Sequence, residues 1–428
     1  MERLLMKELI AWKNKKKRKP ILLKGARQVG KTWLMKEFGR NSFSNVVYIN
    51  FDRKPALRNI FAEDFDVKRI LRMLNVESGE RIMPEKTLII FDEIQEAPEA
   101  IASLKYFCED APEYPVIAAG SLLGVAIHKG ISFPVGKIET LQIYPMSFVE
   151  FLMAMGEEAI ADLLLDGEMP LLKPFADKYI HWLKLYYYIG GMPEAVSDYA
   201  ENGDIVSVRT IQNTILEMYD SDFGKHVEKD ELSRVRLVWN SIPMQLAKEN
   251  KKFFFGQIKK GARLKDFENA IEWLLDCGLI YKVYRVEKPG IPLKAYIDFT
   301  AYKIFTMDVG LLAAMCGLSA DTLLNGNALF TEFKGALTEQ YVFQELKWSA
   351  AGEAYYFSAS SYNEIDFMIQ QGEQVVPIEV KAEENVKAKS LKAYADKYAP
   401  EKAVRFSMKS YDKEKWLVNI PLYAVMNL

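Results

Sequence analysis

The sequence predicts an α/β protein: a parallel β-sheet covered by helices comes first, and a smaller α/β domain ends the chain. Over residues 21–145, short apolar runs alternate with helix-like segments, which is the rhythm of β-α-β units. Several runs are apolar almost throughout, as strands buried on both faces are. From about Phe333 a helix-like segment leads into three alternating strands, YYFSAS, EIDFMIQ and VVPIEVKA, which read as a separate domain.

The expected strands of the first sheet read ILLKG, NVVYINF, TLIIFDE, PVIAAGS and IETLQIYP, and the segments TWLMKEFG and EAIASLKYFCED carry helical periodicity. A chain of 428 residues is long enough for several domains. We expect a parallel-sheet core over residues 1–145, a helical lid over 146–228, a winged-helix-like domain over 229–330 and an α/β domain over 331–428.

The composition excludes several classes of protein. Half of the residues are hydrophobic, which argues against disorder. The net charge of −2 gives no general attraction to nucleic acid, so any such contact needs a local basic patch. The three cysteines lie far apart, which disfavours a disulfide framework or a zinc site. No apolar run approaches the roughly 20 residues of a membrane span, so we expect a cytoplasmic protein with no membrane partner.

A phosphate-binding loop follows the first expected strand and opens a helix. Residues 25–32 fit the pattern GxxxxGK[ST] at every position, in the strand-to-helix context that this motif requires. The glycines let backbone N–H groups wrap phosphates, and the helix N-terminus adds partial positive charge. We expect Lys31 to reach the β- and γ-phosphates of ATP and Thr32 to hold Mg²⁺. The expected ATP-binding residues are Gly25, Ala26, Arg27, Gln28, Val29, Gly30, Lys31, Thr32 and Trp33.

Asp92 and Glu93 end the apolar run TLIIFDE, and carboxylates at the tip of a buried strand are costly unless they serve a metal or a reaction. We expect Asp92 to hold the Mg²⁺ shell and Glu93 to polarise the attacking water. Ser121 ends the next strand, where it could sense the γ-phosphate, although serine after glycine is also ordinary turn chemistry. Arg27 and Lys137 could stabilise transition-state charge, or either could be a solvated surface charge.

The segments GARQVGKT, FDEIQ, AAGSLL, YPMSFVEF and GGMPEAV together resemble a widespread bacterial and archaeal family of AAA-type P-loop ATPases, over nearly the whole chain. Members of that family carry a C-terminal domain of unknown function that is related to restriction-endonuclease-like nucleases. The resemblance implies an ATPase, a hydrolase acting on an acid anhydride. Where members show Gly-Arg, this chain has Gly136 and Lys137, and an ammonium lacks the guanidinium fork.

The last domain carries four polar residues in a suggestive order. Glu339 lies on an expected helix, Asp366 on a strand, and Glu379 and Lys381 on the next strand, where residues two apart share a face. This order resembles the PD-(D/E)xK nuclease core, in which carboxylates gather Mg²⁺ and the lysine acts on the attacking water. We expect all four to be catalytic and Asp366 and Glu379 to be metal ligands. Two alternatives stay open: ordinary charges on a solvent-facing strand, or a nuclease fold kept for binding alone.

The region over residues 229–330 reads as helices followed by the strand-like runs IYKVYRV and LKAYIDF around EKPGIP. Helices followed by a two-stranded wing are typical of a winged helix, which places one helix in a DNA groove. Its basic residues would contact phosphates rather than read bases, or would be ordinary solvated charges on an architectural module. These residues are Lys259, Lys260, Arg263, Lys265, Arg285, Lys288 and Lys294.

Three functions follow from these predictions. The first is an ATP-driven protein that acts on DNA, in which the ATPase cycle moves the winged helix and the nuclease-like domain. The second is an ATP-dependent regulatory or signalling switch whose C-terminal domain docks a partner without cleaving DNA. The third is a chaperone-like remodeller of proteins. DNA is the partner that we expect, the oligomeric state stays open, and stimulation of ATP hydrolysis by DNA separates the first function from the others.

Overall fold

The computed structural model describes residues 2–124, 133–248, 251–325, 331–349, 351–360, 363–383 and 389–428. The chain forms two compact units, which we call the first unit (Glu2–Tyr144 with Asp276–Gly278) and the second unit (Pro145–Leu275 with Leu279–Leu428). The expected parallel-sheet core corresponds to the first unit, and the other three expected regions share the second. No helix within the described ranges is long and apolar enough to cross a membrane.

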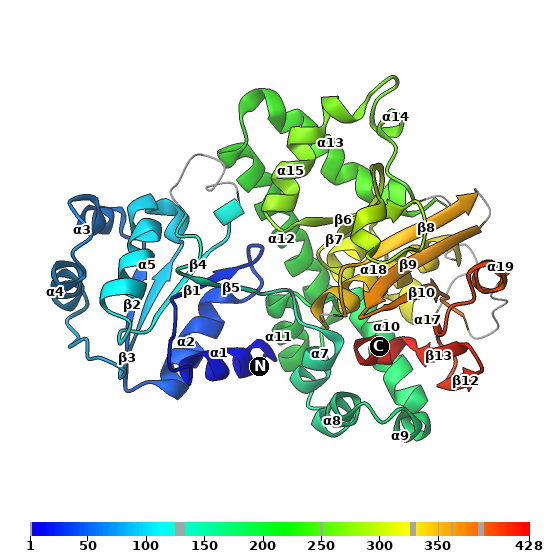
Figure 1. Ribbon diagram of the computed structural model, residues 1–428, viewed down its shortest axis with the longest axis horizontal. Coiled ribbons are helices and arrows are strands. Elements are labelled where there is room, and N and C mark those ends of the chain that lie inside the picture. The colour runs from blue at the N-terminus through cyan, green and yellow to red at the C-terminus, as the bar shows by residue number, and fades with distance from the viewer. Residues whose placement is uncertain are drawn as a thin grey trace. The chain divides into compact units, whose positions relative to one another are not determined.

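The first unit is an α/β fold with helices on both faces of its sheet (Figure 1). All five expected strands are confirmed, each somewhat shorter than its apolar run. They pair in the order β2-β3-β4-β1-β5, and every pair is parallel. The elements are α1 (Leu5–Lys13), β1 (Ile21–Lys24), α2 (Lys31–Ser42), β2 (Asn45–Asn50), η1 (Pro55–Arg58), α3 (Asn59–Ala62), α4 (Val67–Ser78), β3 (Thr87–Asp92), η2 (Ile94–Glu96), α5 (Pro98–Asp110), β4 (Val116–Gly120) and β5 (Glu139–Gln142).

The central strands β1, β3 and β4 are buried on both faces, which is why they read as continuous apolar runs. On one face, apolar side chains of the strands pack against α3, α4 and α5, and the ring centroids of Phe51, Phe61 and Phe91 lie 5.4–5.8 Å apart. On the other face, α2 approaches so closely that a Cβ at Gly39 would lie 2.7 Å from Cγ2 of Val46. The carboxyl ends of the parallel strands share one edge, where ligands bind in sheets of this kind.

The second unit combines helices with an eight-stranded mixed sheet in the order β12-β13-β11-β10-β9-β8-β6-β7. Its strands are β6 (Ile280–Val286), β7 (Ile297–Thr306), β8 (Tyr355–Ser360), β9 (Asn363–Gln371), β10 (Gln374–Val380), β11 (Ala403–Ser407), β12 (Asp412–Glu414) and β13 (Leu417–Pro421). Its helices are α7 (Phe148–Ala154), α8 (Glu158–Asp166), α9 (Met169–Leu172), η3 (Lys173–Phe175), α10 (Ala176–Ile189), α11 (Pro193–Asn202), α12 (Ile205–His226), α13 (Lys229–Leu246), α14 (Phe255–Ile258), η4 (Leu264–Asp266), α15 (Glu268–Asp276), η5 (Leu293–Tyr296), α16 (Val309–Met315), α17 (Ala320–Asn325), α18 (Thr331–Trp348), α19 (Lys389–Tyr398) and η7 (Leu422–Asn427).

The two strands expected as a wing are not an independent hairpin. Strands β6 and β7 pair antiparallel, as expected, but β6 also pairs in parallel with β8, so both belong to the same sheet as the C-terminal strands. Aromatic contacts continue the connection: the ring centroid of Phe305 of β7 lies 4.7 Å from that of Phe343, with the rings stacked, and 5.7 Å from that of Phe367, with the rings tilted. The run LKAYIDF is also only partly a strand, because Leu293–Tyr296 forms a 3₁₀ turn and β7 extends to Thr306. An alternating pattern predicts a strand, but it does not say which edge the strand joins.

The C-terminal part of this sheet follows the expected strands. Helix α18 precedes β8, β9 and β10, which pair antiparallel, and α19 then leads to β11, which lies parallel to β10. Strand β13 continues the sheet in parallel with β11.

Candidate functional site

The phosphate-binding loop joins β1 to α2 and uses its two motif glycines in different ways. Gly30, the residue before α2, has φ +92°, which a side chain would disfavour. Gly25 is instead required by packing, because a Cβ there would lie 2.4 Å from the carbonyl oxygen of Ile143. Gln28 also takes a positive φ, +71°. The motif spacing therefore shapes a tight loop that lies against the chain leaving β5.

Lys31 begins α2 and lies inside this loop. Its side chain is buried, and Nζ donates hydrogen bonds to the carbonyl oxygens of Gly25 at 2.9 Å and Ala26 at 2.6 Å. Burial lowers the pKa of the Lys31 ammonium to about 8, although the carboxylates of Glu93 and Asp92 oppose this shift. The Lys31 ammonium therefore lies within electrostatic reach of both acidic residues.

Asp92 lies at the carboxyl end of β3 with a buried carboxylate that accepts two hydrogen bonds on the same oxygen. Both Thr32 Oγ1 and the Tyr48 hydroxyl donate to Oδ2 at 2.7 Å. The sequence assigned Thr32 and Asp92 to the same Mg²⁺ ion but did not indicate Tyr48. Asn50, two residues after Tyr48, pairs with Asp92 across β2 and β3, so only the strand register could have indicated this contact.

Glu93 follows Asp92 in a left-handed conformation, with φ +51°. Its Oε2 accepts hydrogen bonds from Gln95 Nε2 at 2.6 Å and from Ser121 Oγ at 3.2 Å. The structure therefore brings together Glu93 and Ser121, which the sequence singled out separately. It adds Gln95, which packs so tightly that a Cβ at Gly120 would lie 2.1 Å from its Oε1. A strained non-glycine residue held by two side chains is typical of functional sites.

Arg3 is a buried residue of this site that the sequence did not indicate. One terminal nitrogen donates to the carbonyl oxygen of Val29 at 2.9 Å, and the other donates to that of Tyr144 at 2.6 Å. The two hydrogen bonds of the Arg3 guanidinium thus join the phosphate-binding loop to the segment that follows β5.

The remaining expected residues of the nucleotide site are exposed or surface-paired. Arg27 and Trp33 are exposed. Lys137, the other candidate for stabilising transition-state charge, forms an ion pair of 2.6 Å with Glu109. The hydrogen bond from Lys137 lowers the pKa of the exposed Glu109. This pair favours the reading of Lys137 as a surface charge.

Thr32 and Asp92 fit a magnesium ion. A hydroxyl and a buried carboxylate are oxygen donors of the kind that Mg²⁺ prefers, and this ion takes its other ligands from substrate phosphates and water. The backbone N–H groups of residues 25–31, with the Lys31 ammonium, are suited to the phosphates of ATP.

In the second unit, Asp366 and Glu379 lie on the neighbouring strands β9 and β10. Asp366 Oδ2 accepts a hydrogen bond from the backbone N–H of Val380 at 2.7 Å. Glu379 Oε1 lies 3.0 Å from Nζ of Lys381, as expected for residues two apart, while its Oε2 is buried without a hydrogen-bond partner in the described part of the chain. Burial, with the Glu339 carboxylate adding to it, raises the pKa of Asp366.

Two lysines that the sequence did not single out complete this cluster. Lys303 of β7 has no exposed surface, and its Nζ lies 2.5 Å from Glu364 Oε1 and 3.7 Å from Glu339 Oε2. Lys251 forms an ion pair with the other oxygen of Glu339. Burial alone would raise the pKa of Glu339, but these two ammonium groups hold it below its ordinary value. We call the seven residues the carboxylate–lysine cluster: Lys251, Lys303, Glu339, Glu364, Asp366, Glu379 and Lys381.

As arranged, this cluster does not fit a divalent cation. The charge of Glu339 is already balanced by two lysines, and Lys381 occupies one oxygen of Glu379. Nowhere in the described ranges do three His, Cys, Asp or Glu side chains gather in a group that could hold a metal ion. The sequence predicted that Glu339, Asp366, Glu379 and Lys381 lie close together. It did not indicate that Lys251 and Lys303 pair with these carboxylates.

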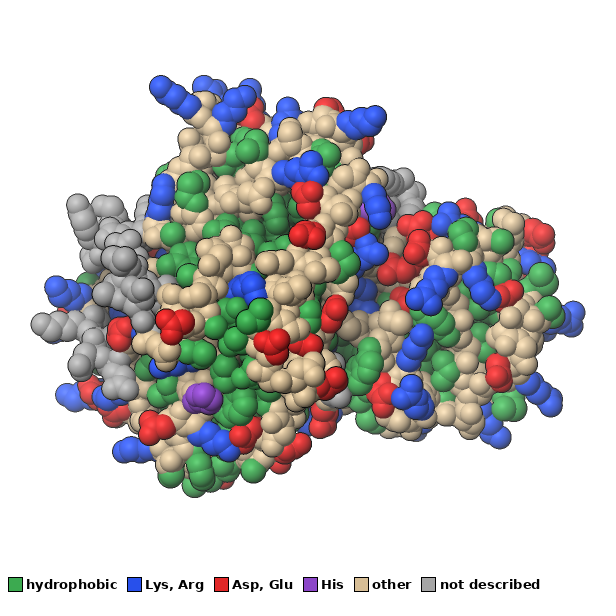
Figure 2. Space-filling model, turned by 180° about the vertical axis from the view of Figure 1, so that it is seen from behind, with side chains coloured by type: hydrophobic (Ala, Val, Ile, Leu, Met, Phe, Trp, Pro, Cys, Tyr) green, Lys and Arg blue, Asp and Glu red, His purple; other side chains and the backbone are tan. Residues whose placement is uncertain are grey.

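Some basic residues of the middle region contact other side chains, and others are exposed to solvent. Arg285 pairs with Asp298 at 2.5 Å, and the ammonium of Lys288 lies 4.4 Å from the ring centroid of Tyr296. Four others, around α14 and η4, are exposed: Lys259, Lys260, Arg263 and Lys265. Figure 1 labels α14 at the top of the second unit, and Figure 2 shows Lys and Arg side chains projecting there.

Three family models match separate stretches of the chain. Residues 17–152 match the AAA domain, residues 180–322 match a domain of unknown function (DUF8612), and residues 334–424 match another (DUF4143). No curated protein matches the chain. Together with the site geometry, the AAA match supports a P-loop ATPase of AAA type in the first unit, and with it ATP binding and hydrolysis.

Several solved structures are similar to parts of the chain at low identity. The Walker-type ATPase of Pyrococcus abyssi is 15% identical, over 73% of this chain and 94% of that one, with a TM-score of 0.44. The Drosophila ORC bound to DNA is 14% identical over 76% and 94%, with a TM-score of 0.25. The Saccharomyces cerevisiae Hsp104–ADP complex is 12% identical over 64% and 37%, with a TM-score of 0.28. With TM-scores below 0.5, these likenesses establish no common function.

Proposed function

We propose that this protein hydrolyses ATP in its first unit and uses the ATPase cycle to act on DNA through its second unit. The observation that carries the ATPase is the hydrogen bond from Thr32 Oγ1 to the buried Asp92 carboxylate, with Glu93 next in the chain. A loop that cradles phosphates, a hydroxyl and carboxylate for Mg²⁺, and a second carboxylate for the water are the parts that phosphoryl transfer to water requires.

The residues divide the work of hydrolysis as follows. Backbone N–H groups of residues 25–31 bind the phosphates, and the Lys31 ammonium leaves the carbonyls of Gly25 and Ala26 to neutralise them. Mg²⁺, when bound, neutralises the charge that develops on the phosphates. Glu93 accepts the proton of the attacking water, while hydrogen bonds from Gln95 and Ser121 to its Oε2 orient the carboxylate.

Contact with DNA is supported by the exposed residues Lys259, Lys260, Arg263 and Lys265. Their ammonium and guanidinium groups suit phosphates and carry no base specificity. Such binding weakens with added salt because bound counterions are released.

A second candidate, an ATP-dependent switch that docks a partner without cleaving DNA, is favoured by the carboxylate–lysine cluster. Lysines pair with Glu339 and Glu379, two of the carboxylates that cleavage would need. Metal-dependent cleavage through Glu339, Asp366, Glu379 and Lys381 stays a hypothesis from the sequence order alone.

The deciding experiment measures the ATPase rate with single-stranded, duplex and branched DNA, in parallel with strand nicking in Mg²⁺ or Mn²⁺. Lys31→Ala should abolish hydrolysis, and Glu93→Gln should bind ATP but turn it over far more slowly. Stimulation by DNA that is lost when Lys259, Lys260, Arg263 and Lys265 are replaced by Gln supports action on DNA. The exposed Lys7 of α1, replaced by Gln, is the matched control. No stimulation by any DNA favours the switch or the protein remodeller, and nicking that persists in Asp366→Ala rejects the nuclease hypothesis.

A further inference from the structure

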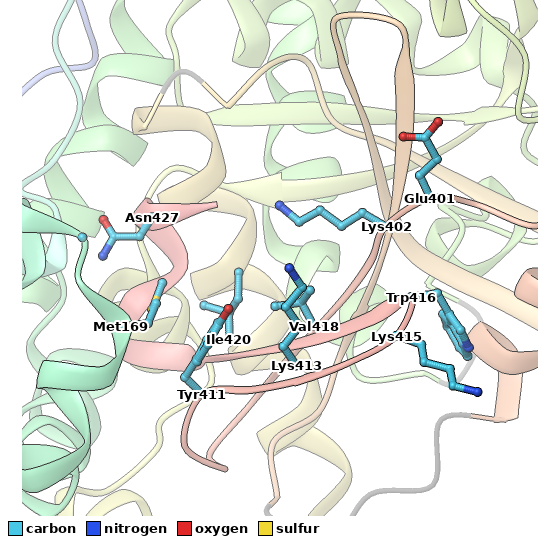
Figure 3. A pocket seen from close by; sticks show the side chains of 11 residues that line it. Met169, Glu401, Lys402, Tyr411, Lys413, Lys415, Trp416, Val418, Ile420 and Asn427 are labelled. Carbon is cyan, nitrogen blue, oxygen red and sulfur yellow. The ribbon is translucent and has the colours of Figure 1, made fainter.

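A pocket of about 380 Å³ opens in the second unit beside the β12–β13 hairpin (Figure 3). Its volume lies within the roughly 300–1,000 Å³ of small-molecule sites. None of the carboxylate–lysine cluster lines it. The side chains that give it chemical character are Lys402, Tyr411, Lys413, Lys415 and Trp416.

Two ammonium groups converge in this pocket. Lys402 and Lys413 extend toward the same part of it, whereas Lys415 points away (Figure 3). Burial, with the charge of Lys413 adding to it, lowers the pKa of Lys402. Two like charges held together favour a multiply charged anion between them, because such a ligand removes their repulsion.

The neighbouring carboxylates do not neutralise these lysines. Glu401 lines the pocket but accepts a hydrogen bond from Gln374, and Asp412 pairs with Lys409 at 2.7 Å. Lys413 lies between Asp412 and Glu414 in β12, and successive side chains of a strand point to opposite faces. The side chain of Lys413 therefore points away from these two carboxylates. Within the described residues, neither Lys402 nor Lys413 has an ion-pair partner.

The pocket also offers aromatic surface. Tyr411 precedes β12 and Trp416 follows the hairpin turn, where Lys415 adopts a left-handed φ of +35°. The carbonyl oxygen of Trp416 accepts a hydrogen bond from Ala403 N at 2.8 Å, which ties the turn to β11. A non-glycine residue kept in this region indicates that the surrounding structure fixes the turn.

We propose that this pocket binds one nucleotide unit, with its phosphate between Lys402 and Lys413 and its base against the aromatic side chains. Ammonium groups make charge-assisted hydrogen bonds to phosphate, and aromatic rings stack on bases without regard to sequence. The unit is either a free mononucleotide or the end of a single strand. This site is separate from the phosphate-binding loop, and its occupation does not depend on ATP hydrolysis.

The test uses the full chain with Lys31→Ala, which disables the phosphate-binding loop, and measures AMP binding by calorimetry. We expect one AMP site that the joint change Lys402→Met and Lys413→Met weakens at least about tenfold, because two charge-assisted contacts are lost. Lys409→Met is the matched control: this lysine pairs with Asp412 outside the pocket, so its change should leave the affinity as it was. Competition by a 5′-phosphorylated single strand assigns the site to strand ends, and its failure assigns the site to free mononucleotides.

Three outcomes overturn the proposal: no AMP binding, AMP binding that the double change leaves intact, or displacement of AMP by an equal concentration of inorganic phosphate. If the double variant does not fold, the experiment uses the chain with Lys31→Ala alone and measures reductive methylation of lysines by mass spectrometry. AMP should then protect Lys402 from methylation, while Lys409 stays reactive. Equal modification of Lys402 with and without AMP also rejects the site.

Discussion

The carboxylate of Asp308 accepts a hydrogen bond from the backbone N–H of Gly191 at 2.6 Å, across 117 positions of the chain. Its other oxygen accepts one from Leu311 N at 2.8 Å and so caps α16. The carbonyl oxygen of Gly191 in turn accepts from the N–H of Met146 at 2.6 Å. Met146 belongs to YPMSFVEF and Gly191 to GGMPEAV, so two of the five segments on which the family resemblance rests are joined by hydrogen bonds.

Gly190 shows how tightly this junction is packed. It has φ +72°, and a Cβ there would lie 2.2 Å from Oδ1 of Asp308. We expect Gly190→Ala to lower the free energy of unfolding by about 3 kcal/mol or more, because steric overlap adds to left-handed strain. Gly203 has φ +65° with no atom within 4 Å of its Cβ position, so Gly203→Ala should cost only about 1 kcal/mol. Differential scanning calorimetry measures both, and equal losses would contradict the packing argument.

Glu345 should make stability depend on pH. Burial, with Glu150 adding to it, raises the pKa of this carboxyl from 4.5 to about 8, although the Phe148 N–H donates to it at 3.1 Å. The folded state therefore binds more protons than the unfolded state between these values. This contribution to stability is present below pH 4.5 and is lost as pH rises through about 8.

Glu345→Gln keeps an acceptor for Phe148 and removes the titration. We expect the variant to gain stability relative to the parent as pH rises from 5 to 8, by on the order of 1 kcal/mol or more. Melting temperatures across this pH range measure the effect. The exposed Glu158 of α8, changed to Gln, should leave the pH profile unaltered. Parallel profiles for parent and Glu345→Gln would reject the assignment.

Tyr48 should position Asp92, which we propose as a magnesium ligand. Its hydroxyl and that of Thr32 share the same carboxylate oxygen. Because partners of metal ligands tune affinity by about ten- to a hundredfold, we expect Tyr48→Phe to raise the Mg²⁺ concentration for half-maximal ATPase about tenfold. The maximal rate should fall less than this concentration rises. Tyr106→Phe, which keeps a ring stacked on Phe65, is the control. A fall in rate without a change in Mg²⁺ dependence would assign Tyr48 a merely structural role.

Lys303 should decide whether the carboxylate–lysine cluster can accept a metal. Lys303→Met removes the ammonium that pairs with the carboxylates of Glu339 and Glu364. Because buried charges then lack a partner, we expect the free energy of unfolding to fall by about 3–5 kcal/mol. Without nucleotide, added Mg²⁺ or Mn²⁺ should raise the melting temperature of this variant and leave that of the parent unchanged. Lys334→Met breaks only the surface pair with Glu383 and should cost less than about 1 kcal/mol. A rise in the melting temperature of the parent on adding metal would instead show that a cation can displace the lysines of the carboxylate–lysine cluster.

Much of the first unit could be predicted from the sequence. All five strands follow from contiguous patterns, most clearly β1, β3 and β4, because burial on both faces makes a strand apolar throughout. The phosphate-binding loop follows because phosphate binding needs glycine and lysine at fixed spacing. The second unit could be predicted only in part. Its C-terminal strands follow the expected alternation, but the sequence assigned β6 and β7 to a separate wing.

The sequence by itself determined the nucleotide loop, the acidic end of β3 and the order of the polar residues near the C-terminus. These features are local, and their chemistry is fixed by residue type and spacing. Only the tertiary structure decided that Tyr48 and Gln95 hold the two carboxylates of the nucleotide site, that Lys251 and Lys303 fill the C-terminal cluster, and that β6 joins β8. Each of these contacts depends on strand register or on chain segments brought together by the packing of buried side chains, and a single sequence records neither.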